Sequence, residues 1–232
     1  MADYINKNIL SQAYIHIESE VAESEQLLEE FKQLITEFAR SRVDFFLSPD
    51  APIEVDFEEG SLIARITVLG TIGLLLQGIA NYKNFREGIQ LIYSDAKRVT
   101  DYVISEGVFT AGSRQQNVIR LEARVGIIGS IQKVINQLEG IKSGANGRKL
   151  ASDLVDKLID SNKEIEKLIS NLATESDIEL VKKGLLEIVD EMPEEPQPPK
   201  NKINEVAAVN SYRNQKKKLR IRLSSTANKP IQ

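Results

Sequence analysis

The sequence predicts an α+β protein, a predominantly helical bundle with a small antiparallel β-sheet built on a hairpin. Residues 53–68 alternate apolar and charged side chains on both sides of a Glu59-Gly60 pair, which is the pattern of a hairpin. Long stretches elsewhere carry apolar residues at spacings of three and four, which indicates amphipathic helices. A chain of 232 residues can form one large domain or one domain with appendages.

The expected hairpin has a consistent register. With Glu59-Gly60 at the turn, where glycine tolerates positive φ, Phe57 faces Leu62 and Glu54 faces Arg65. Val55 faces Ala64 and Ile53 faces Ile66 on the same apolar face as Phe57, whereas Asp56 faces Ile63 and Glu58 faces Ser61 on the other face. A slip of one residue would turn the apolar set to water, so the pattern specifies which face packs on the core.

Residues 3–47 are predicted to form one long helix, interrupted in register at Ser24 and ended by Pro49 and Pro52. The alternative is a short strand over residues 13–18, where apolar and polar side chains alternate. We prefer the helix because its apolar face extends further along the chain: Leu10, Tyr14, Ile17, Val21, Leu28, Phe31, Ile35 and Phe38.

After the hairpin, a buried helix that bends at its glycines is expected from Thr71 to Glu106, and a loop from Gly107 to Gly112. Ser113 is spaced from Gln116 as in a capping box, which predicts the start of another helix. The apolar face of that helix would consist of Val118, Leu121, Val125, Ile128, Ile135 and Leu138.

Two more helices are predicted beyond a turn at residues 143–147. The first carries an apolar stripe from Ala151 to Leu172. The second begins at a capping box of Ser176 and Glu179 and ends near Ile188.

The chain is expected to divide into three parts. Residues 1–191 would form the helical α+β domain, and residues 192–202 a proline-rich, semi-rigid linker. Residues 203–232 would form a basic C-terminal arm, with a strand over residues 218–223 where basic and apolar residues alternate. We hypothesise that this strand pairs with the hairpin, or with the hairpin of another copy, because Glu54 and its acidic neighbours complement its basic face.

Composition and charge set broad limits on function. The net charge of −4 produces no global field that would select nucleic acid or an anionic membrane. The chain contains no cysteine, which excludes disulfides and thiolate metal sites and fits a reducing compartment. Because the N-terminus also lacks the pattern of a secretory signal, we expect a cytoplasmic protein.

No motif for catalysis, for a metal or for a cofactor is recognised, so we predict a non-enzymatic protein without a cofactor. His16 is the single histidine, and no nucleophile elbow, P-loop or dinucleotide fingerprint accompanies it. The acidic row Glu54, Asp56 and Glu58 could bind Mg²⁺, but a solvated strand face explains it better because hard-cation sites need ligands from several elements.

Three functions are considered, of which the first is preferred: an interaction or regulatory module acting through helix faces and the basic arm, with a protein partner or self-association into a homo-oligomer. The second is nucleic-acid binding by the basic residues of the arm: Arg213, Lys216, Lys217, Lys218, Arg220 and Arg222. The third is membrane association by the apolar segment 66–80, which is too short to span a bilayer.

A polar cluster of Arg86, Asp95 and Lys97 beside the apolar segment is a candidate site for an anionic ligand, unless it is a helix surface with ion pairs between turns. Residues 58–97, with their Gly78-Ile79-Ala80-Asn81-Tyr82 and Phe85-Arg86-Glu87-Gly88 motifs, are similar to uncharacterised bacterial proteins. Some of these proteins accompany mobile-element or defence genes. The resemblance implies no activity and assigns no functional residue.

Overall fold

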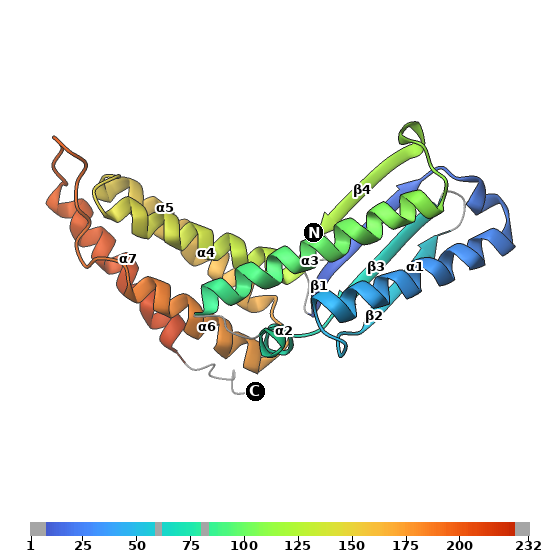
Figure 1. Ribbon diagram of the computed structural model, residues 1–232. Helices are drawn as coiled ribbons and strands as arrows, with labels where there is room; N and C mark the ends of the chain where they lie inside the picture. The colour runs from blue at the N-terminus through green and yellow to red at the C-terminus, as the bar shows by residue number, and fades with distance from the viewer. Residues whose placement is uncertain (1–7, 59–61, 80–83, 226–232) are drawn as a thin grey trace, which may run out of the picture. The chain divides into compact units, whose positions relative to one another are not determined.

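The computed structural model describes residues 8–58, 62–79 and 84–225, and these residues form an α+β fold with a four-stranded antiparallel sheet and mostly helical remainder, as predicted (Figure 1). The chain divides into two compact units. The first unit comprises Met1–Lys83 and Glu87–Gly129, and the second comprises Asn84–Arg86 and Ser130–Gln232.

The sheet of the first unit has the strand order β2-β3-β1-β4. The strands are β1 (Ile9–Ile17), β2 (Ile53–Glu58), β3 (Leu62–Leu69) and β4 (Val118–Arg124), and all neighbours are antiparallel. Helix α1 (Glu25–Phe46) connects β1 to β2, and α2 (Ile72–Gly78) and α3 (Phe85–Thr110) lie between β3 and β4. This β-α-β-β-α-β order, apart from the short α2, is the ferredoxin-like split-βαβ topology.

The predicted hairpin is confirmed, but its register differs by two residues. Phe57 pairs with Ala64, and Asp56 with Arg65, whereas the sequence pattern suggested Leu62 and Ile63 as their partners. A shift of two keeps every side chain on the expected face, because side chains alternate with a period of two. The predicted turn residue Gly60 lies outside the described residues.

The prediction of one helix over residues 3–47 is wrong, and the strand alternative is right. Residues 9–17 form β1, which lies between β3 and β4 and places Ile15 and Ile17 on the apolar face of the sheet. Ser24, expected to interrupt a helix, is the N-cap of α1, where its hydroxyl accepts a hydrogen bond from the Leu27 amide at 3.4 Å. Leu10, Tyr14 and Ile17 of β1 lie three and four residues apart, which is why the strand also matched a helical pattern.

The long helix predicted over residues 71–106 consists of two helices, α2 and α3, and α3 continues through the expected loop at Gly107. Both α1 and α3 cover the apolar face of the sheet (Figure 1). Gly107 explains their close approach, because a Cβ at this position would lie 2.5 Å from Ile15 Cδ1 of the sheet and 3.6 Å from Ile35 Cδ1 of α1.

The helix predicted to begin at Ser113 is also wrong. A short 3₁₀ turn, η3 (Gln115–Asn117), leads into β4, and α4 (Gly126–Ala145) begins only after that strand. Val118 and Leu121 belong to β4, where pairing with the otherwise free edge of β1 outweighs the helical spacing of the apolar residues.

The second unit is a helical bundle of the later part of α4, α5 (Ala151–Ser170), α6 (Glu175–Asp190) and α7 (Val206–Ser224). The predicted helices over residues 151–172 and 176–188 are present, although Thr174, and not Ser176, caps α6 by accepting from the Asp177 amide at 3.2 Å. Helix α7 packs on both α5 and α6.

The predicted strand over residues 218–223 is wrong, because these residues lie within α7. Tyr212, Lys216, Leu219 and Leu223 share one helix stripe and are buried, whereas the alternating pattern would also require Ile221, which is 58% exposed. Burying four residues at helical spacing therefore favours the helix over a strand with three alternating apolar residues.

The proline-rich segment between α6 and α7 is tied to the helices of the second unit. The Gln197 amide donates to the Ala145 carbonyl at 2.8 Å, and the Asn204 side chain donates to the Pro196 carbonyl at 2.7 Å. Tyr212 and Lys216 of α7 hold the start of the segment, donating to the carbonyls of Pro193 at 3.1 Å and Met192 at 2.7 Å. Burial raises the pKa of Tyr212 to about 12.

Candidate interaction surfaces

Aromatic side chains from α1 and α3 form a cluster around Arg42, which we call the Arg42 patch and which consists of Phe38, Arg42, Phe45, Phe46 and Tyr102. The ring centroids of Phe45 and Phe46 lie 4.8 Å apart, and those of Phe46 and Tyr102 lie 5.7 Å apart. The Arg42 guanidinium lies 4.6 Å from the centroid of Phe38 and 5.6 Å from that of Tyr102. These contacts make the patch one continuous surface across the two helices.

Two of the four aromatic residues in the Arg42 patch, Phe45 and Tyr102, are exposed to solvent, and Phe38 and Phe46 are half-buried. The side chain of Phe45 is 79% exposed, and Phe109 and Leu34, at neighbouring positions on α3 and α1, are also exposed. Helical spacing explains the continuity, because residues three and four apart on a helix share a face. Exposed aromatic side chains that gather in this way make a candidate interaction surface.

Arg42 has no anionic partner among the described residues. Its neighbours one turn away on α1 are Phe38 and Phe46, and its buried Nε has no hydrogen-bond acceptor. A buried guanidinium nitrogen without an acceptor is costly in the isolated protein.

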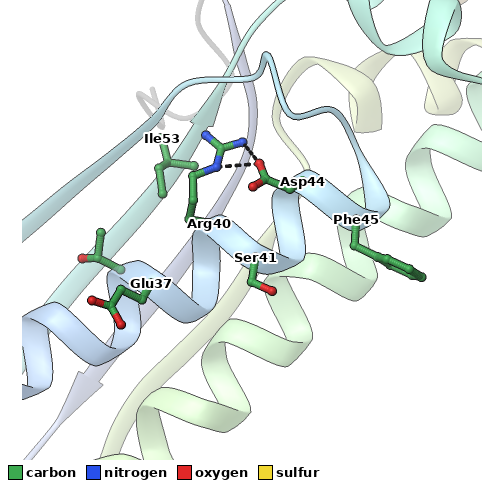
Figure 2. Close-up of a pocket in the computed structure, with 7 residues that line it drawn as sticks. Glu37, Arg40, Ser41, Asp44, Phe45 and Ile53 are labelled. Carbon is green, nitrogen blue, oxygen red and sulfur yellow. Dashed lines mark hydrogen bonds and ion pairs between the residues drawn. The ribbon is translucent and has the colours of Figure 1, made fainter.

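Arg40, two residues earlier, contrasts with Arg42 because its guanidinium is fully engaged. It pairs with Asp44 and donates to the carbonyl of Ala51 at 2.7 Å and to that of Ser48 at 3.3 Å, which fixes the loop after α1. Figure 2 shows the Arg40–Asp44 pair, with the Phe45 ring pointing away from the pair. The pair lies in an open groove with a volume of about 760 Å³. The groove is lined by Thr36, Glu37, Arg40, Ser41, Asp44, Phe45 and Ile53.

The face of the sheet opposite α1 and α3 is polar. Its side chains form three rows that run across the strands. The pairing registers place Glu58, Ile63, His16 and Arg120 in one row. The next row consists of Asp56, Arg65, Tyr14 and Glu122, and the third of Glu54, Thr67, Gln12 and Arg124. The β2 end of this polar face is therefore acidic, and the β4 end carries two arginines.

Tyr14 lies at the centre of the polar face with three guanidinium groups around its ring. The distances from the ring centroid are 4.4 Å to Arg124 and 5.6 Å to both Arg65 and Arg120. Hydrogen bonds from Arg124, and then from Arg120, lower the pKa of Glu122, and the hydrogen bond with Glu58 raises the pKa of Arg65. His16 meets Tyr14 edge to face at 6.5 Å, consistent with a structural position in the sheet.

Four of the six basic residues predicted to form a binding arm are engaged in ion pairs of the second unit. Lys216 is buried and pairs with Glu194 at 2.6 Å, and Arg213 pairs with Glu195. The other two pairs are Arg220–Asp190 at 2.8 Å and Arg222–Glu166 at 3.2 Å. Lys217 and Lys218 are exposed and have no ion pair within the described part of the chain.

The residues of the predicted polar cluster divide between the two units. Arg86 belongs to the second unit and pairs with Glu139 at 2.8 Å. Asp95 and Lys97 belong to the first unit, where Asp95 pairs with Arg98 at 3.1 Å and Lys97 is exposed. Positions 86 and 95 are about 14 Å apart along a regular helix, so they do not converge on one small ligand.

Glu139 is the centre of an ion-pair network in the second unit. Lys142 donates to Glu139 at 3.1 Å and to Glu191 at 2.6 Å. Burial acts to raise the pKa of Glu139, but the hydrogen bonds from Arg86 and Lys142 outweigh it and lower this pKa. The network links α4 to the end of α6 and has a structural role.

The apolar segment 66–80 begins in β3 and continues through α2, where Ile66, Ile72 and Leu75 are buried. None of the helices in the described ranges is long and apolar enough to cross a membrane. Among the same residues, no group of three histidine, aspartate or glutamate side chains is placed to hold a metal ion.

Comparisons with models of known protein families, with curated proteins and with solved structures found no match. The sequence interpretation missed the Arg42 patch, although it placed Phe38 on a helix face. The available signal was the spacing of Phe38, Arg42 and Phe46, each one helical turn from the next, with Phe45 alongside. Tyr102 of α3 could not be added, because its proximity depends on the packing of two helices.

Proposed function

We propose that the protein is a non-enzymatic interaction module that binds another protein through the Arg42 patch on α1 and α3. The observation that carries this proposal is an arginine without an anionic partner, stacked on two aromatic rings within an exposed apolar surface. Aromatic residues and arginine are the side chains most enriched in the energetic centres of protein interfaces. The cysteine-free sequence supports a cytoplasmic location.

The chemistry of the patch defines the partner that we expect. Phe45 and Tyr102 would be covered by apolar side chains, since their exposure in the free protein is unfavourable. The Arg42 guanidinium would donate hydrogen bonds to a carboxylate of the partner, in a site that the partner shelters from water. The partner segment is therefore one that presents an aspartate or glutamate between apolar residues.

Other surfaces support the two alternative functions less well. Nucleic-acid binding by residues 213–222 would require ion pairs with Glu194, Asp190 and their neighbours to be exchanged for phosphate contacts. Membrane association by residues 66–80 would require buried core residues such as Ile72 and Leu75 to leave the first unit. Binding through the Arg42 patch requires no such rearrangement.

The test is affinity capture with the full chain and three variants, followed by quantitative mass spectrometry. Arg42→Ala should reduce capture of the specific partner at least 10-fold, and Arg42→Lys should restore it only in part, because lysine lacks the planar guanidinium. Arg148→Ala is the matched control, since Arg148 is an exposed arginine of the second unit and is not part of the patch. Identical capture by all four proteins would exclude the Arg42 patch as the binding surface.

A further inference from the structure

We propose that two copies of the chain associate through the polar faces of their sheets, with β2 of one copy over β4 of the other. This inference concerns the face of the sheet opposite the Arg42 patch and is independent of the proposed partner. The polar face is left uncovered by α1 and α3, which both lie on the apolar face (Figure 1). The charges at the two ends of one row are accessible, since the Glu58 side chain is 51% exposed and that of Arg120 is 58% exposed, whereas Arg124 is 15% exposed and pairs with Glu122.

Two of the three rows of the polar face end in charges of opposite sign. One row runs from Glu58 on β2 to Arg120 on β4, and another from Glu54 on β2 to Arg124 on β4. Consider a two-fold axis that lies between the two facing sheets, parallel to the strands and midway between β3 and β1. This axis places each row over the same row of the second copy, in the reverse order. Glu58 then lies over the partner copy's arginine at position 120, and Glu54 over the one at position 124.

In two of the three rows the central positions are also complementary under this two-fold axis, and in the third Ile63 lies over His16. Arg65 of one copy lies over Tyr14 of the other, which reproduces between copies the guanidinium–ring contact that each copy already contains. Thr67 lies over Gln12, and within each copy the Gln12 amide donates to the Thr67 hydroxyl at 2.8 Å. Sheets packed face to face lie about 10 Å apart, a gap that arginine and glutamate side chains can bridge.

One position opposes the association, and the alternative symmetry is worse. Asp56 faces Glu122 of the other copy, but Glu122 already pairs with Arg120 and with Arg124, the latter at 2.6 Å. A two-fold axis perpendicular to the strands would instead place each β2 over itself. The acidic residues of β2 in one copy would then face the same acidic residues in the other copy. The arginines of the two β4 strands would also face each other, and both contacts are repulsive. The charge pattern therefore selects the axis parallel to the strands.

The experiment uses two charge-reversed full-length chains, Glu58→Arg and Arg120→Glu, studied by analytical ultracentrifugation. We expect the natural chain to dimerise, and each variant alone to dimerise roughly 100-fold more weakly, because each homodimer gains two like-charge contacts. An equimolar mixture should form a heterodimer, since every altered position then faces an opposite charge. Glu29→Arg and Arg98→Glu, exposed charges on α1 and α3, are the controls and should leave dimerisation unchanged.

Melting temperatures identify any variant that fails to fold, because Glu58 also pairs with Arg65 within its own chain. A second measurement avoids this difficulty: the chain has no cysteine, so Asp56→Cys can be spin-labelled at a single site. The two β2 backbones would be roughly 17 Å apart in the proposed dimer and about 10 Å apart in the alternative one. A natural chain that stays monomeric, a mixture that does not recover the dimer, or the shorter distance would overturn the proposal.

Discussion

Gly126, the first residue of α4, offers a sharp test of the close packing between α4 and β1. Its φ of +49° lies in the left-handed region, which costs a residue with a side chain about 1–2 kcal/mol. A Cβ would also lie 2.3 Å from the Ile9 carbonyl oxygen and 2.8 Å from that of Leu10. These are backbone atoms that cannot rotate away, and accommodating such overlap costs roughly 1–3 kcal/mol.

Gly126→Ala should therefore destabilise the first unit by about 2–5 kcal/mol, measured by urea denaturation followed by circular dichroism. Gly140→Ala is the matched control on the same helix, because a Cβ at Gly140 would meet nothing within 4 Å. That change should instead stabilise the second unit by about 0.5–1 kcal/mol through helix propensity. A loss below about 0.5 kcal/mol for Gly126→Ala would refute the predicted packing of α4 against β1.

Two further predictions concern the second unit. Because the folded-state pKa of Tyr212 is raised to about 12, the stability that depends on its proton is complete below pH 10 and is lost as the pH rises toward 12. Urea denaturation across that range should show a loss of roughly 2–3 kcal/mol that is absent in Tyr212→Phe, and equal pH dependence of the two proteins would contradict it. Leu219→Ala should destabilise the unit by about 2–5 kcal/mol and Ile221→Ala, at an exposed position, by less than about 0.5, whereas a strand would make the two losses similar.

Local alternation predicted the hairpin well, because Glu54, Asp56 and Glu58 lie on one face of an edge strand and report its geometry directly. For β1, alternation over residues 13–18 indicated the strand, but the longer helical spacing was preferred to it. Alternation did not reveal β4, whose identity as a strand depends on pairing with β1. It also failed for residues 218–223, where three alternating apolar residues concealed the helical stripe of Tyr212, Leu219 and Leu223.

The candidate surfaces were less accessible to sequence reasoning than the fold. The basic residues of α7 were identified from their spacing, but their acidic partners come from α5, α6 and the proline-rich segment. Arg42 was overlooked because an arginine beside aromatic residues is unremarkable until a second helix brings Tyr102 to it. Contacts between distant segments decide both cases, and no local pattern encodes them.

The most direct test of the proposed interaction module is photo-crosslinking in the cells that make the protein. A benzophenone amino acid would replace Phe45 or Tyr102 in the Arg42 patch, or Ile203, which is an exposed apolar residue of the second unit. We predict that the first two positions crosslink to the same protein, that Ile203 does not, and that adding Arg42→Ala abolishes the product. Crosslinks that are absent from both patch positions, or that persist without Arg42, would contradict the proposed function.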